Sequence, residues 1–166
     1  RLEFSILILL VSSVLLSDCG PAVQVAASSL ERVSQPDVPA ADLQQLVAGN
    51  NAFAFDLLRE AGPAGGNLVY SPYSISLALA MTYAGARGET ADQMAQTLHF
   101  TLPGSQLHPA FNALDLDLAA RPAQAQDVPE KDRFTLDIVN SLWGQQDWSF
   151  LPEYLDLLAA NYGAGL

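Results

Sequence analysis

Few side chains in this sequence could do acid–base or nucleophilic chemistry, and their spacing matches no hydrolase motif. The two histidines, His99 and His108, are the imidazoles that could activate a serine nucleophile as a general base. The sequence has no Gly-x-Ser-x-Gly turn, and its single lysine, Lys131, has Val128 where a Ser-x-x-Lys pair needs a serine. Each histidine adjoins a proline or a phenylalanine near an expected helix boundary, which favours an ordinary surface position. We therefore expect no catalytic residue and no enzyme activity.

The other polar residues predict neither a metal site nor a cofactor site. The two histidines are separated by nine positions, and a single cysteine makes no ligand cluster. Asp115 and Asp117 are two positions apart, so they would face different sides of a helix. Gly85 and Gly88 are not followed by the Lys-Ser or Lys-Thr pair of a phosphate-binding loop.

The composition indicates one modest and strongly acidic domain. The chain has 166 residues, of which 50% are hydrophobic, so it can build a packed core. Its formal net charge of -11 argues against nucleic acid as a ligand, because a phosphate backbone needs a basic surface. The acidic residues are scattered along the sequence, which is typical of a solvated surface rather than of an acidic binding patch.

Residues 1–27 are predicted to be an export signal. The chain begins with Arg1 rather than Met, so we expect its true start to be missing. An apolar run of signal-peptide length, Ile6 to Leu16, follows this positive residue. The run is shorter than the about 20 apolar residues that a membrane-spanning helix needs. Residues 20–41 are rich in Ala, Ser, Val, Gln and Pro, and residues 28–41 are predicted to link the signal to a domain at 42–166.

Two processing routes fit this signal, and the sequence leaves both open. The only cysteine, Cys19, stands just after the apolar run, as in a bacterial lipoprotein signal whose cysteine is lipidated. Asp18, however, occupies a position where a small neutral residue is expected. The alternative is cleavage after Ala27, which satisfies the small-residue rule and would discard Cys19. Both routes predict an exported protein, extracellular or at the cell surface, with a membrane contact only through a lipid anchor at Cys19.

Hydrophobic periodicity predicts about five helices and two strands after residue 41. At the start of the second helix, Ser71 suits the N-cap and Pro72 suits the first helical position. The pattern Thr90-Ala91-Asp92-Gln93 predicts a capping box at the start of the third. We expect helices near 42–61, 72–84, 90–98, 105–120 and 152–162, and strands at 67–70 and 134–143.

The second helix and the long strand both require a sheet that these residues do not supply. The helix carries apolar side chains around most of its circumference, so it must lie inside a large structure. In the strand, apolar and polar residues alternate, and Val139 and Trp143 indicate that the second face is also partly covered. A long strand needs neighbours for its backbone groups. We therefore predict an α+β fold in which N-terminal helices accompany the first strands of a large β-sheet, as an incomplete domain.

A set of spaced residues between positions 67 and 100 follows the pattern of one family. The pattern is Asn-x-x-x-Ser-Pro-x-Ser-x-x-x-Ala-Leu, then Gly-Ala-x-Gly-x-Thr, then Leu-x-Phe. It falls on Asn67, Ser71, Pro72, Ser74, Ala78, Leu79, Gly85, Ala86, Gly88, Thr90, Leu98 and Phe100. Residues 139–164, VNSLWGQQDWSFLPEYLDLLAANYGA, look like a long central strand and its following helix in the same family. The chain from about residue 43 onward thus resembles the N-terminal part of a serpin, with a weaker match at 101–132.

The resemblance implies a protease inhibitor that works as a suicide substrate. In serpins, a serine protease, or in some members a cysteine protease, cleaves an exposed reactive loop. The loop then inserts as a strand, and the trapped acyl-enzyme is distorted as stored strain is released. Five residues would belong to the region where the central sheet opens, with a structural rather than a catalytic role. They are Asn67, Ser71, Pro72, Ser74 and Asn140.

The resemblance covers less than half of a serpin domain, and the reactive loop lies outside it. The leading function is therefore a serine-type endopeptidase inhibitor in its full-length form. The alternatives are a non-inhibitory serpin-fold binding or chaperone protein and a nonfunctional truncated product. We also expect residues 42–166 alone to fold poorly, because removal of the sheet would expose Leu77, Met81, Leu142 and Trp143.

Overall fold

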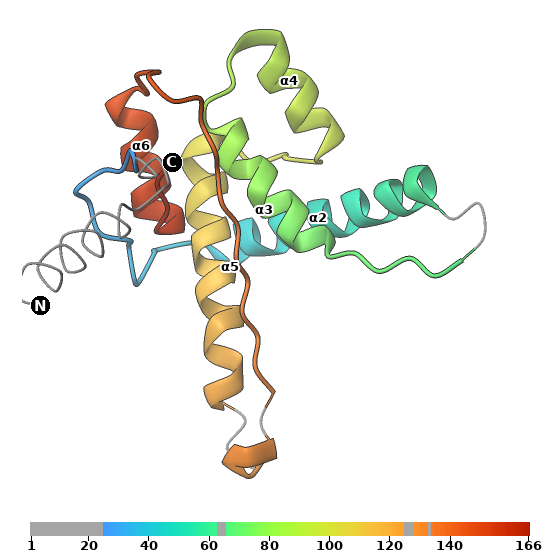
Figure 1. Cartoon of the computed structure of the whole chain (residues 1–166). Helices are drawn as coiled ribbons and strands as arrows, with labels where there is room; N and C mark the ends of the chain where they lie inside the picture. The colour runs from blue at the N-terminus through green and yellow to red at the C-terminus, as the bar shows by residue number, and fades with distance from the viewer. Residues whose placement is uncertain (1–24, 63–65, 125–127, 133) are drawn as a thin grey trace, which may run out of the picture.

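The structure is a computed structural model of the chain, and it describes residues 25–62, 66–124, 128–132 and 134–166. These residues form five α-helices and one short 3₁₀ turn. Helix α3 packs on α2 and α4, and the long helix α5 packs on α2 and α6 (Figure 1). The elements are α2 (Ala40–Ala61), α3 (Pro72–Tyr83), α4 (Gly88–Thr97), α5 (Gly104–Gln124), η1 (Glu130–Asp132) and α6 (Pro152–Tyr162).

The expected strands are absent from the part of the chain that the structure describes. Residues 67–70 connect to α3 without strand pairing, and residues 134–143 run as an extended segment alongside α5 and across α3 (Figure 1). The prediction of an α+β fold with the first strands of a sheet is therefore wrong, because the described residues are helices joined by extended connections. An extended segment becomes a strand only where a neighbouring strand pairs with its backbone groups, and no described residues pair with these segments in that way.

The hydrophobic core lies where α2, α3 and α5 meet. Phe111 of α5 is fully buried, and its ring stands edge-on to that of Phe100 with a centroid separation of 5.7 Å. Tyr83 at the end of α3 makes a similar contact with Phe100 at 5.5 Å. The other buried residues of this cluster are Leu46, Phe53, Leu77, Ala80, Leu98, Leu102, Leu107 and Ala110.

Helix α3 is covered nearly all round, as its composition predicts. Within Pro72–Tyr83, Thr82 is the one exposed residue. Leu77 and Met81 are 6% and 2% exposed, because Ile138 of the extended segment and residues of α6 take part in covering them. The expectation that Leu77 and Met81 would be exposed in this chain is therefore wrong. Trp143 was predicted to be exposed as well, and it is 81% exposed. The prediction that residues 42–166 fold poorly now rests on the extended segment.

The helix boundaries agree with the sequence except at α4 and α5. Helix α4 begins at Gly88 with Arg87 as its N-cap and no side-chain cap, so the predicted capping box at Thr90 is wrong. Helix α5 extends to Gln124, four residues past its predicted end at 120. Gly163 ends α6 in the left-handed conformation, with φ of 61°, as its position after the last turn predicts.

Residues 1–24 lie outside the described residues, so Cys19 and most of the predicted export signal do as well. Within the described ranges, no helix combines the length and the apolar character that crossing a bilayer requires. The division into 1–27, 28–41 and 42–166 stays a prediction.

Candidate functional site

The start of α3 holds the first cluster of predicted site residues. The hydroxyl oxygen of Ser71 accepts a hydrogen bond from the backbone N–H of Ser74 at 3.2 Å and lies 2.9 Å from the Ser74 hydroxyl. Pro72 occupies the first turn of the helix, where its missing N–H leaves no hydrogen bond unmade. Ser71 is therefore the N-cap and Pro72 the helix opener, which confirms both local predictions. The preceding Tyr70 donates its hydroxyl to the Ala54 carbonyl at 3.1 Å, which ties this turn to α2.

Buried polar groups continue along α3 behind this cap. Ser76 is fully buried and donates its hydroxyl to the side-chain oxygen of Asn50 at 2.6 Å, so its desolvated hydroxyl is satisfied. Burial raises the pKa of Tyr73, and the negative charge of the nearby Asp115 raises it further, so this tyrosine stays protonated. The Ser76–Asn50 hydrogen bond ties α3 to α2, and neither Ser76 nor the protonated Tyr73 is a reactive anion.

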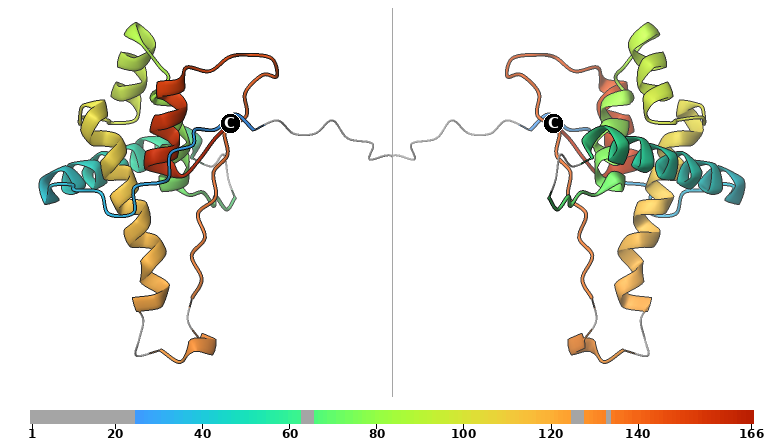
Figure 2. Two further views of the ribbon diagram at one scale, coloured as in Figure 1. Left: turned by 90° about the vertical axis from the view of Figure 1, so that its left-hand side faces the viewer. Right: turned by 90° about the vertical axis from the view of Figure 1, so that its right-hand side faces the viewer.

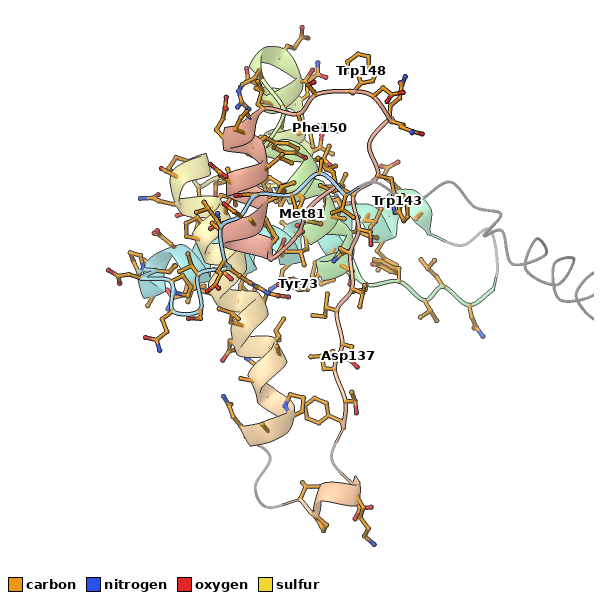
Figure 3. The ribbon with its side chains drawn as sticks, turned by 60° about the vertical axis from the view of Figure 1, so that its left-hand side comes forward. Tyr73, Met81, Asp137, Trp143, Trp148 and Phe150 are labelled. Atoms are coloured by element: carbon orange, nitrogen blue, oxygen red, sulfur yellow. The ribbon has the colours of Figure 1, made fainter. Side chains whose placement is uncertain are left out.

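Asn140 lies in the extended segment, apart from the serine cap. It lines a groove of about 170 Å³ together with Leu77 and Met81 of α3, and a second groove of about 370 Å³ with Trp143. Its side-chain nitrogen is buried and has no hydrogen-bond partner among the described residues. The exposure of the side chains alternates along residues 138–143, as it does in an extended chain. Residues 138, 140 and 142 are half-buried, and residues 139, 141 and 143 are exposed. The tryptophans at 143 and 148 project away from the helices (Figure 3).

The structure gathers four of the five predicted site residues in one stretch and leaves the fifth elsewhere. The four are Asn67, Ser71, Pro72 and Ser74, of which Asn67 is exposed. Within the described part of the chain, no hydrogen bond joins Asn140 to either serine. Their structural role stays a prediction.

His108 is buried, so the expectation of a surface position is wrong for this residue. Its side chain in α5 is 3% exposed, and its Nδ1 lies 2.6 Å from the hydroxyl of Tyr162 in α6. The ring also packs against Tyr83, with a centroid distance of 6.2 Å. Burial lowers the pKa of His108 to about 4, because a charged imidazolium loses its hydration there. The residue is a neutral part of the packing at neutral pH.

His99 keeps a partly exposed position at the turn that follows α4. Its Nε2 lies 2.6 Å from the carboxylate of Asp56 in α2, and Arg59 pairs with the other oxygen of that carboxylate. The hydrogen bond from His99 is the main cause that lowers the pKa of Asp56. Since the two histidines bond an aspartate and a tyrosine, the described residues contain no Ser–His pair for nucleophilic catalysis.

One polar network escaped the sequence-based search. Arg32 donates from Nε to the side-chain oxygen of Asn112 and from Nη2 to the carboxylate of Asp115, both at 2.8 Å. The side-chain nitrogen of Asn112 donates to the Val33 carbonyl at 2.7 Å, so this fully buried amide is bonded through both of its polar atoms. A signal exists in the sequence, because His108, Asn112 and Asp115 recur at i, i+4 and i+7 on one helix face.

Asp117 points the other way and pairs with Arg121 at the surface, as the spacing from Asp115 predicts. Within the described ranges, no three His, Cys, Asp or Glu side chains lie close enough together to hold a metal ion. The arrangement is thus one of caps, buried polar contacts and grooves rather than of reacting groups.

Comparison with known protein families identifies the family to which this chain belongs. Residues 48–166 match the family described as Serpin (serine protease inhibitor). Because the match spans more than half of the chain, the protein belongs to the serpin family, as the spaced motifs at 67–100 predict.

The relatives include named inhibitors. The leukocyte elastase inhibitor of Bos taurus is 42% identical over 127 residues, which are 75% of this chain and 30% of that protein. The leukocyte elastase inhibitor of Homo sapiens is 39% identical over 127 residues, 75% of this chain and 31% of that protein. An uncharacterized serpin-like protein of Thermococcus kodakarensis is 38% identical over 112 residues, 68% of this chain and 24% of that protein. The chain therefore spans less than a third of the length of these relatives.

Proposed function

We propose that this protein, in its full-length form, inhibits a serine-type endopeptidase, with a cysteine protease as the alternative target. The observation that carries the proposal is the family match over residues 48–166, joined to relatives that are named as elastase inhibitors. The described residues contain no nucleophile–base pair, so they lend no support to a hydrolytic alternative.

The proposed mechanism is suicide inhibition. The nucleophile of the protease attacks a carbonyl carbon in an exposed reactive loop, the peptide bond there breaks, and the loop stays joined to the enzyme as an acyl ester or thioester. Insertion of the cleaved loop into the inhibitor then distorts the acyl-enzyme before water can hydrolyse it. The groups that react are the protease nucleophile and the loop, which lies outside the residues that match the family here.

The residues of this chain are proposed to act as supports for that mechanism. Ser71 and Ser74 fix the start of α3, and Asn140 lies in the extended segment, where it lines a groove with Leu77 and Met81 of that helix. In a protein that works by a large rearrangement, such contacts set how readily the structure opens. They would alter the rate and the yield of inhibition without touching the protease.

The test is a search for the covalent complex. The protein, expressed from its complete gene, is mixed with a leukocyte-type elastase and analysed by denaturing gel electrophoresis. We expect a band that combines the two polypeptides and resists boiling in detergent, together with loss of peptidase activity. Elastase whose active-site serine has been blocked is the control, and it should form no such band. Cleavage of the inhibitor by active elastase without an adduct would contradict the proposal and favour a non-inhibitory serpin.

We further propose that the protein is exported, either by cleavage after Ala27 or as a lipoprotein anchored at Cys19. The support is the apolar run at residues 6–16 and the two cleavage patterns that follow it. Mass spectrometry of the mature N-terminus separates these routes. A lipid-modified cysteine at the first position would support the anchor, and Ser28 at the first position would support ordinary cleavage. An unprocessed N-terminus would contradict export by either route.

A further inference from the structure

Residues 26–33, called the strap here, lie across α6 and then α5 before the chain enters α2 (Figures 1 and 2). They precede residues 48–166, which carry the family match. The strap contains no helix and no strand, yet it is held at several points by specific hydrogen bonds. A free linker would be solvated along its length, so these contacts require an explanation.

The first set of contacts joins the strap to α6. Ser28 donates its hydroxyl to the carboxylate of Asp156 at 2.5 Å, a short bond of the charge-assisted kind. Five residues later, the backbone N–H of Val33 donates to the carbonyl of Ala160 at 2.9 Å. The two acceptors lie one helical turn apart, so the strap runs along α6 rather than touching it at a single point.

The second set joins the strap to α5 through Arg32. The guanidinium of Arg32 binds Asn112 and Asp115, and its side chain is only 27% exposed in the ion pair. Asn112 also donates a hydrogen bond to the backbone carbonyl of Val33, so α5 contacts both a side chain and the main chain of the strap.

Arg32 also lies over the end of α6, which allows it to bridge the two helices. A Cβ atom added to Gly163 would lie 3.2 Å from Cδ of Arg32, so the aliphatic stem of the arginine passes close over this glycine. Glycine suits position 163 for two reasons. It adopts the left-handed conformation that ends α6, and its missing side chain leaves room for the stem of Arg32. The head of Arg32 thus binds α5 while its stem covers α6.

We propose that the joint face of α5 and α6 is a peptide-docking surface that recognises an extended Ser-x-x-x-Arg segment, and that its occupant is the strap of the same chain. Each fixed position of this segment has its own contact: Asp156 for the serine, and Asn112 and Asp115 for the arginine. Ala160 and Asn112 bind the backbone of the next residue, Val33, whose side chain is exposed. Both processing routes that the sequence predicts leave Ser28 and Arg32 in the mature protein. Cleavage after Ala27 would remove the first two residues of the strap, but the contacts of Ser28, Arg32 and Val33 survive either route.

The test supplies the segment from outside. In the full chain expressed from its complete gene, Ser28→Ala and Arg32→Ala together should release the strap and leave the surface empty. A fluorescent synthetic peptide of residues 25–38 is then titrated, and binding is followed by anisotropy. We expect saturable binding to the double variant, and binding at least about tenfold weaker when the peptide carries Arg32→Ala, because two charge-assisted hydrogen bonds are lost. The wild-type protein, whose surface is occupied, should bind the peptide weakly.

A control variant tests whether the loss of any arginine that pairs with an aspartate of α5 has the same effect as the loss of Arg32. Arg121 also pairs with an aspartate of α5, but it does so at the exposed far side of the helix. Arg121→Ala should leave the strap docked, so that protein should bind the peptide as weakly as wild type does. Equal binding of the two peptides by the double variant, or no binding of either, would overturn the proposal.

A second measurement does not depend on the peptide. The Val33 amide is protected by its bond to α6, so its hydrogen exchange reports strap opening directly. Arg32→Ala should accelerate that exchange at least about tenfold, whereas Arg121→Ala should change it by less than about twofold. An unchanged Val33 amide in Arg32→Ala would show that the arginine does not hold the strap, and the proposal would fail.

Discussion

Acidification should destabilise the protein through one buried group, His108. Its ring is 3% exposed and lies between Tyr162 and Tyr83. Burial lowers the pKa of His108 from 6.5 to about 4, while the same residue in the unfolded chain titrates in its ordinary range. Between these two pH values the unfolded chain therefore binds a proton that the folded protein does not. By linkage, the free energy of unfolding must decrease as the pH falls through this window.

The magnitude follows from the difference between the two pKa values. A pKa that falls from 6.5 to about 4 corresponds to roughly 3 kcal/mol of stability that is present near neutral pH and lost toward pH 4. That loss is a large share of the about 5–15 kcal/mol that stabilises a typical domain. It should be visible above the contributions of exposed carboxylates.

The assay is urea unfolding at the two ends of this window, in the protein expressed from its complete gene. Wild type and the control variant His99→Gln should both lose roughly 3 kcal/mol toward acid pH, because each retains the buried histidine. His108→Gln should be less stable near neutral pH but should lose much less on acidification. Tyr162→Phe removes the hydroxyl that bonds His108 and keeps the imidazole, so its pH dependence should persist. If His108→Gln and wild type lost stability in parallel, the reasoning about this histidine would be refuted.

Three further outcomes are expected. Ser71→Ala should lower the free energy of unfolding by about 1 kcal/mol in urea titrations, because the cap to the N–H three residues on is lost, and Ser71→Asp should restore most of it. Gly49→Ala should lower the melting temperature, because the added Cβ would lie 2.4 Å from the backbone oxygen of His99. Overpacking costs about 1–3 kcal/mol, which exceeds the gain of about 1 kcal/mol in helix propensity from glycine to alanine. Gly104→Ala is the control and should be tolerated, because its Cβ would make only an ordinary contact at 3.9 Å. Both tryptophans, 81% and 68% exposed, should be quenched by iodide in the 166-residue chain at rates near that of free tryptophan, and strong protection would contradict the exposed extended segment.

Local rules predicted much of the helical structure. Ser71 and Pro72 begin α3 as their types require, and the all-round apolar surface of that helix correctly indicates burial. Gly163 ends α6 for the same local reason, because only glycine adopts the left-handed conformation without a steric penalty. These outcomes depend on a few neighbouring residues, so the sequence suffices for them.

The extended segment shows where such rules stop. The predicted alternation holds at residues 138, 140 and 142, which are half-buried, but Phe134 and Leu136 of the same predicted face are exposed. The segment does not become a strand either, because extended backbone forms a sheet only with a partner. Val139 was expected to be partly covered and is 83% exposed. Pairing is a property of two segments, so one segment alone cannot specify it.

The polar face of α5 was missed because its partners are distant in the sequence. Asn112 and Asp115 bind Arg32, some 80 residues earlier, and His108 binds Tyr162, 54 residues later. A search for reactive motifs treats these side chains as unrelated. Their helical spacing identifies one face, but only the fold shows that this face is buried against the strap and α6.

The most direct test of the central claim, that these residues belong to an inhibitory serpin, is to read the coding DNA beyond the codon for Leu166. We expect the frame to continue for most of a further domain and to encode a hinge of small residues before an exposed reactive loop. That loop would name the protease class to assay. A stop codon directly after Leu166 would leave the protein without a reactive loop and would contradict protease inhibition as its activity.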